Sequence, residues 1–168
     1  MEKPTQKMPE FLLYINKYRD QLVNHAFYRI GDFEEAEDIV QDVFVKVYAQ
    51  NLYTKLETPE HYLYKMTMNA CLDFLRKQQS KHKMQQYFET EAQDGLENDA
   101  VRNIKMREEF VRINKILNIL PKKQAEVVRF RIIDELSFKD ISSILRKPES
   151  TVKSRYQYAI NKLKNYEL

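Results

Sequence analysis

The chain has 168 residues, enough for one or two small domains with modest cores. It holds only two glycines and no tryptophan, which argues against β-hairpin turns and Gly-rich phosphate loops, and its Lys-, Glu-, Leu- and Ile-rich runs favour helices. The net charge is +3, but residues 1–79 hold ten Lys/Arg against twelve Asp/Glu, whereas residues 105–168 hold fifteen against eight. Any affinity for nucleic acid is therefore expected at the C-terminal end.

The lone Cys71 excludes an internal disulfide and indicates a reducing compartment. Because it lies in a helical apolar run, we expect a buried structural thiol and not a nucleophile. The N-terminus lacks the apolar core of a signal peptide, and no run is long enough to span a membrane. These features predict a soluble cytoplasmic protein without membrane insertion.

The first predicted helix covers residues 8–30 and ends at Gly31, a residue suited to a left-handed C-cap. Its His25 is expected at a core edge. Asp32 is the predicted N-cap of a second helix, whose core stripe recurs at helical spacing and comprises Phe33, Ala36, Val40, Val43 and Val47.

The outer face of this second helix is acidic and includes Glu34, Glu35, Asp38, Gln41, Asp42 and Val45. A metal site is disfavoured, because the histidine spacing of helical metal motifs is missing. A solvated face and a docking face for a basic partner both remain open from the residues alone.

Thr58 and Pro59 open a third predicted helix, with Thr58 as its cap and Pro59 at its first position. Aromatic, amide and basic residues are interleaved along it: Tyr62, Tyr64, Lys65, Asn69, Arg76 and Lys77. Such a set can hold unstacked single-stranded bases, although core aromatics followed by a basic last turn would give the same pattern.

A polar, acidic stretch from Ser80 to about Asp99 is the predicted flexible linker and domain boundary. Helices are predicted over residues 100–119 and 121–134, the second one beginning at Pro121. The sequence thus predicts an all-α protein with two small helical domains, residues 1–79 and 100–168, joined by a flexible acidic linker at 80–99. The C-terminal domain is a four-helix unit.

The last two helices of that unit have the pattern of a helix-turn-helix. Ser137 caps the first of them, with Asp140 three residues on, and Pro148 prevents it from continuing. The second helix packs through Val152, Tyr156, Ile160 and Leu163, and its opposite side offers Lys153, Ser154, Gln157 and Asn161, with Arg155 at the edge. These side chains can bond base edges or phosphates, but an ordinary helical hairpin is the alternative interpretation.

Three blocks carry a resemblance to a known family: DFEEAEDIVQDVFVKVY, HYLYKMTMNACLDFLRKQ and LPKKQAEVVRFRIIDELSFKDISSILRKPESTVKSRYQYAINKLK. In this order, and over nearly the whole chain, they strongly resemble the extracytoplasmic-function (ECF) class of bacterial sigma factors. The resemblance implies a transcription initiation factor that binds core RNA polymerase, through the β′ coiled coil and the β flap, and promoter DNA as duplex and melted strand.

The resemblance also implies a role for each set of residues. Asp38, Gln41 and Asp42 become candidates for docking on core polymerase. Contacts to the −10 element are implied for Tyr62, Tyr64, Lys65, Asn69, Arg76 and Lys77, with Asn69 near a flipped-out base. Contacts to the −35 element are implied for Thr151, Lys153, Ser154, Arg155 and Gln157, of which Thr151 and Arg155 lie near phosphates.

The sequence departs from the family pattern at a few positions. Tyr62 stands where Trp is usual, Glu135 and Arg146 stand where Gly is common, and Glu149 at the start of the recognition helix would repel phosphate. We expect no enzymatic activity, no cofactor and no metal, and a monomer when free; an anti-sigma protein is a possible further partner in this family. A stand-alone helix-turn-helix regulator is the alternative, and a metal-dependent phosphohydrolase is disfavoured because the histidines are scattered at 25, 61 and 82.

Overall fold

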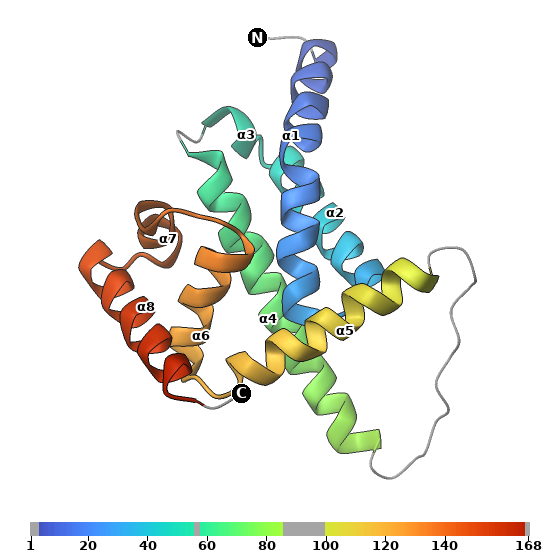
Figure 1. Cartoon of the computed structure of the whole chain (residues 1–168). Coiled ribbons are helices and arrows are strands. Elements are labelled where there is room, and N and C mark those ends of the chain that lie inside the picture. Colours follow the sequence, from blue (N-terminus) through green and yellow to red (C-terminus); the bar gives the residue numbers. More distant parts are fainter. Residues whose placement is uncertain (1–3, 56–57, 86–99, 167–168) are drawn as a thin grey trace.

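The computed structural model describes residues 4–55, 58–85 and 100–166, and over these ranges it is helical without strands. The predicted all-α class is therefore confirmed. The elements, in chain order, are α1 (Pro4–Ile30), α2 (Phe33–Ala49), α3 (Leu52–Lys55), α4 (Pro59–Gln85), α5 (Ala100–Leu117), α6 (Lys122–Val128), the π-helical turn η1 (Arg129–Ile133), α7 (Phe138–Leu145) and α8 (Glu149–Lys164) (Figure 1).

Helices α1, α2 and α4 pack together as an N-terminal unit (residues 4–85). Gly31 ends α1 with φ of 77°, and the Asp32 side chain caps α2 by accepting a hydrogen bond from the Glu35 amide at 3.1 Å, both as predicted. The α2 stripe is buried at Ala36, Val40, Val43 and Val47. Phe33 is the exception: at the first turn of the helix its ring is 37% exposed, so its assignment to the core stripe was wrong.

Helix α4 begins at Pro59, as predicted, but continues to Gln85. The predicted linker therefore starts inside a helix, because the polar residues from Ser80 onward lack a helix breaker and extend the exposed end of α4. The rest of the predicted linker, residues 86–99, lies outside the described part of the chain.

The C-terminal unit (residues 100–166) contains the four predicted segments with one change. The segment predicted as a single helix over 121–134 is α6, with Pro121 at its N-cap position, followed by the wider η1 turn. The Asp134 amide donates to the Arg129 carbonyl at 3.1 Å, an i to i−5 bond typical of a π-turn. This extra residue in the turn sets where Phe130 and Asp134 lie.

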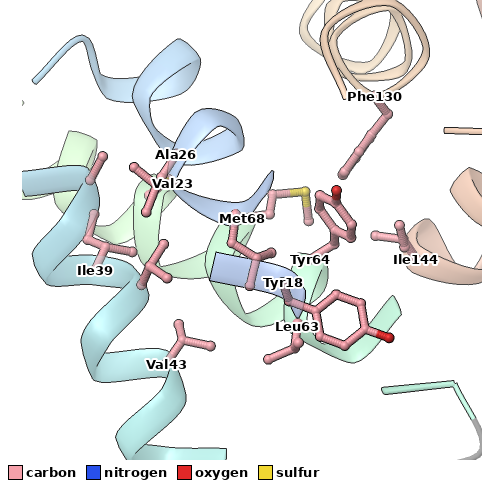
Figure 2. Packing of buried hydrophobic residues seen from close by; sticks show 14 of the residues in the cluster. Tyr18, Val23, Ala26, Ile39, Val43, Leu63, Tyr64, Met68, Phe130 and Ile144 are labelled. Carbon is pink, nitrogen blue, oxygen red and sulfur yellow. The ribbon is translucent and has the colours of Figure 1, made fainter. Parts of the chain in front are cut away.

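The two units share one hydrophobic core. Phe130, Ile141 and Ile144 of the C-terminal unit are buried in the same cluster as residues of α1, α2 and α4, and Figure 2 shows Phe130 and Ile144 beside Tyr64. Helix α5 crosses α1 (Figure 1), with Phe110 at 6.0 Å from Phe27, ring centre to ring centre. The expected two modest cores are thus largely merged, which buries more apolar surface than either unit could alone.

Polar contacts also cross between the units. His25 Nδ1 lies 2.7 Å from Asp134 Oδ2, and His61 Nε2 lies 2.8 Å from Asp140 Oδ1. The Tyr28 hydroxyl donates to Glu109 at 2.9 Å. His25 is only 1% exposed, so its expected place at a core edge was wrong: the edge of the α1 core is covered by η1 of the other unit.

The turn between α7 and α8 contains a strained residue. Arg146 is left-handed, with φ of 52° and ψ of 47°, a conformation that costs an L-residue roughly 1–2 kcal/mol and a glycine almost nothing. Since glycine loses about 0.5–1 kcal/mol more entropy on folding, we expect Arg146→Gly to raise the free energy of unfolding by ~0.5–1 kcal/mol. Urea unfolding would measure it.

Lys147→Gly is the matched control, because Lys147 is the next basic residue and does not have a positive φ. It should lower the free energy of unfolding. If Arg146→Gly is also destabilising, the left-handed conformation is not strained in the folded protein.

Candidate nucleic-acid interface

Helices α7 and α8 form the predicted helix-turn-helix. Ser137 Oγ accepts from the Asp140 amide at 3.1 Å and donates to the Asp140 carboxylate at 2.8 Å, so the predicted cap is confirmed. After α7, the Arg146 and Lys147 amides both return to the Ser142 carbonyl, while Ser142 Oγ donates to the Lys147 carbonyl at 2.6 Å. Pro148 then occupies the N-cap position of α8, which begins at Glu149 as predicted.

The outer face of α8 carries the predicted base-reading residues. Lys153, Ser154 and Gln157 are exposed, whereas Thr151 and Arg155 are half-buried at the sides of this face. Val152 and Ala159 are buried on the opposite side. Lys153 Nζ lies 3.3 Å from Glu149 Oε1, and Gln157 donates to Asn161 at 3.2 Å. The structure therefore assigns Glu149 a partner on its own helix, which the sequence pattern did not reveal.

On α4, the predicted strand-binding residues other than Tyr64 lie on the outer side of the helix. Asn69, Arg76 and Lys77 are exposed, and Tyr62 and Lys65 are half-buried. The Arg76 guanidinium pairs with Asp73 at 3.2 Å. Asn69 and Lys77 line one groove of about 450 Å³ between α2 and α4.

Tyr64 differs from the others because it is only 2% exposed. Its ring meets His25 edge-on at 5.2 Å and lies beside Phe130 and Ile144 (Figure 2). Burial, reinforced by the nearby carboxylates Asp134, Glu60 and Asp140, raises the pKa of this phenol well above its usual range. In this arrangement Tyr64 is a core residue and cannot stack on a base.

The outer face of α2 carries the predicted docking residues, and Asp38, Gln41 and Asp42 are all exposed. Asp38 and Asp42 line the same groove as Asn69, so residues assigned to different partners lie side by side. On the other flank, Asp38 and Gln41 border a second groove of about 430 Å³ between α1 and α2. The apolar side chain of Val45 lies in that groove and is 60% exposed. Leu13 of α1 is also exposed, which the sequence did not predict.

Three further sequence expectations concern Cys71, metal binding and membrane-spanning helices. Cys71 is fully buried, and burial raises its thiol pKa to about 12, so it is the expected inert structural thiol. Within the described ranges, no group of three or more His, Cys, Asp or Glu side chains could hold a metal ion. None of the helices described has the length and apolar composition needed to cross a membrane.

Comparison with known families gives two matches in chain order. Residues 14–81 match Sigma-70 region 2, which covers α1 from Tyr14 onward, all of α2 and most of α4. Residues 110–163 match Sigma-70, region 4, which ends with the helix-turn-helix. The docking and −10 candidates fall in the first match and the −35 candidates in the second.

Individual relatives agree with these matches. The chain is 29% identical over 155 residues to "ECF RNA polymerase sigma factor SigW" of Bacillus subtilis (strain 168), covering 84% of this chain and 80% of the relative. It is 25% identical over 162 residues to "ECF RNA polymerase sigma factor SigX" of the same strain, covering 93% of this chain and 82% of the relative.

Two solved structures have the same fold. The CnrH chain in "Structure of CnrH in complex with the cytosolic domain of CnrY" is similar with a TM-score of 0.67 at 18% identity, over 94% of this chain and 86% of that one. RpoE from Bartonella quintana, solved with the anti-sigma factor NepR, is similar with a TM-score of 0.63 at 22% identity, over 92% and 94% of the two chains. With both sigma regions present in order and ECF relatives along most of its length, this chain belongs to the extracytoplasmic-function class of RNA polymerase sigma factors.

Proposed function

We propose that this sigma factor docks on core RNA polymerase through the outer face of α2 and contacts the two promoter elements with α4 and α8. This proposal rests on three exposed polar faces, which lie on three separate helices, each within the matching sigma region. When polymerase holds two weak DNA contacts at a fixed spacing, their binding free energies add and their affinities multiply, so neither contact needs to be strong alone.

The −35 contact is proposed for the outer face of α8. Lysine can donate to guanine O6 and N7, and glutamine can bond adenine bidentately, so Lys153 and Gln157 are the proposed base readers together with Ser154. Thr151 and Arg155, at the sides of the face, are placed to contact phosphates, which set the register of the helix.

The −10 contact is proposed for α4. Asn69 would bond the flipped-out base, with Tyr62 and Lys65 beside the separated strand and Arg76 and Lys77 near its backbone. Tyr64 remains part of this proposal only for an arrangement in which the C-terminal unit no longer covers its ring.

Docking on polymerase is proposed for Asp38, Gln41 and Asp42, with the β′ coiled coil as the partner and the β flap as a contact of the C-terminal unit. Acidic side chains around exposed Val45 suit a basic partner helix with an apolar seam. The same chain would act in the cytoplasm, as a monomer when free, without catalysis of its own. An anti-sigma protein is a further proposed partner, since the sigma factor RpoE, which has a similar fold, was solved in complex with the anti-sigma factor NepR.

Reconstitution tests the proposal as a whole. The purified chain would be mixed with core RNA polymerase and a library of genomic promoter fragments, and specific initiation would be mapped. We expect a stable complex with core enzyme and initiation at a defined set of fragments. Tight binding to duplex DNA as a dimer without polymerase, and no initiation with it, would instead favour a stand-alone regulator.

Substituting the proposed base readers should relax discrimination at the −35 element. For Lys153→Ala or Gln157→Ala we expect a loss of about 1–3 kcal/mol for the preferred base, and little change when that base is altered. Competition between matched and mutated −35 duplexes, with the variant bound to core polymerase, measures the difference.

Lys164→Ala is the matched control, because Lys164 is also exposed on α8 but lies in its last turn. It should weaken binding to all sequences equally or not at all. An equal loss across sequences for Lys153→Ala would mean that Lys153 contacts a phosphate.

A further inference from the structure

A polar cluster is buried where the two units meet. It joins His25 and Arg29 of α1 to Glu126 of α6 and to Asp134 at the end of η1. His25 is 1% exposed, and the Asp134 side chain, 109 residues away in sequence, is 2% exposed. Arg29 Nη2 lies 2.5 Å from Glu126 Oε1. The ring of Phe130 stacks on His25 at 5.4 Å, and Arg29 lies over its face at 4.9 Å.

The hydrogen bonds of this cluster require a neutral His25. Arg29 Nε, which always carries its proton, donates to His25 Nε2 at 2.9 Å, so this ring nitrogen must be the acceptor. The proton then sits on Nδ1, which donates to Asp134 Oδ2 at 2.7 Å. A second proton on the ring would place an N–H of His25 against the N–H of Arg29 and break that bond.

The charges around His25 shift its pKa in both directions. Burial and the Arg29 guanidinium lower the pKa of His25, and they outweigh Asp134 and Glu126, which raise it. The titratable and charged groups that face the site come from every element packed on it: Arg29 of α1, Tyr64 and Cys71 of α4, Glu126 of α6, Arg129 of η1, and Asp134.

The polar cluster is sensitive to the charge of each of its members. Burying ions costs several kcal/mol each unless every hydrogen bond is made, yet Asp134 Oδ1 has no hydrogen-bond partner among the described residues. A change of charge on one member leaves a buried charge without its partner, which destabilises such a network.

The closed arrangement does not suit promoter binding. It packs α4 against α7 and buries Tyr64. By their names, the −10 and −35 elements lie about 25 base pairs apart, roughly 85 Å at ~3.4 Å per base pair. A compact chain of this length has a radius of gyration of only about 15 Å.

We propose that the His25–Arg29–Glu126–Asp134 cluster is a latch that holds the two units closed while His25 is neutral and releases them when His25 is protonated. Opening uncovers Tyr64 and lets α4 and α8 separate to promoter spacing. The consequence for promoters rests on the proposed function, whereas closure and its release do not.

The sign of the pH dependence follows from linkage. Because the pKa of His25 is lowered in the closed form, the open form binds the proton more tightly. Closure is therefore fully stable above the ordinary pKa of 6.5 and weakens as the pH falls below it. His61 lies 2.8 Å from Asp140 across the same interface and provides the histidine for comparison.

Small-angle X-ray scattering of the full chain, without polymerase, tests the latch. The radius of gyration would be measured from about pH 8 to about pH 5.5, either side of the ordinary histidine pKa, with circular dichroism as the check on helicity. We expect it to rise from near 15 Å as the pH falls, with helicity unchanged. No rise, or a rise accompanied by loss of helicity, would overturn the proposal.

Two variants test whether protonation of His25 causes the expansion in acid. His25→Gln removes the titration while its amide can still donate to Asp134 and accept from Arg29, so its radius of gyration should not change with pH. His61→Gln is the matched control and should expand in acid as the wild type does. The proposal is wrong if His25→Gln still expands, or if His61→Gln abolishes the expansion. Since no polymerase is used, these outcomes are independent of those of the reconstitution.

Discussion

Phe130→Ala should lower the free energy of unfolding by about 3–5 kcal/mol, the cost typical of emptying the site of a buried aromatic ring. Phe130 is fully buried, and both His25 and Arg29 pack on its ring at the junction of the two units. The surrounding residues cannot collapse into the gap without breaking the polar cluster. For a chain of this size, the loss corresponds to a melting temperature roughly 10 °C lower, measurable by calorimetry.

Phe33→Ala provides the comparison, because the Phe33 ring is 37% exposed at the start of α2. Its removal should cost about 1 kcal/mol or less, as for most surface substitutions. Equal losses in the two variants would show that the junction contributes no more to stability than the surface does.

Asp38→Lys combined with Asp42→Lys should weaken binding to core RNA polymerase at least ~100-fold, about 2.7 kcal/mol. Reversing two charges on the proposed docking face turns an attraction to a basic partner into repulsion, which costs several kcal/mol at an interface. Both positions are exposed and helical, and lysine is a good helix former, so α2 should stay folded. Titration of labelled variant with core enzyme gives the dissociation constant.

The control makes the same change of charge elsewhere. Glu10 and Asp20 are both exposed on α1, and Glu10→Lys with Asp20→Lys should leave the affinity within about threefold, since surface charges away from an interface are largely screened. If the control loses as much affinity as the α2 variant, the effect comes from net charge and not from a docking face.

The helices themselves were predictable because their signals are local. Asp32 and Ser137 cap the helices they precede, Gly31 and Pro59 mark an end and a beginning, and each acts through the backbone of its own neighbours. The helix-turn-helix was also predictable, because the apolar spacing of α7 and the break at Pro148 need no distant partner.

What the sequence could not predict is set by distant contacts. Nothing in the spacing of residues near His25 points to Asp134, and Tyr64 has the same local pattern whether it faces DNA or another helix. The π-turn at Arg129 was likewise read as ordinary helix, because its apolar residues keep helical spacing while tertiary packing shifts the hydrogen bonds. The docking, −10 and −35 assignments stay predictions.

The pair between Glu149 and Lys153 has a consequence for how the recognition helix searches DNA. The Lys153 ammonium already has a carboxylate beside it, so in the proposed −35 contact it would exchange that neighbour for a base or phosphate. One fewer condensed counterion is then released on binding, and the slope of log affinity against log salt is shallower by about 0.9. Random-sequence DNA is held less tightly as a result, while a guanine in the right register can still compete for the lysine.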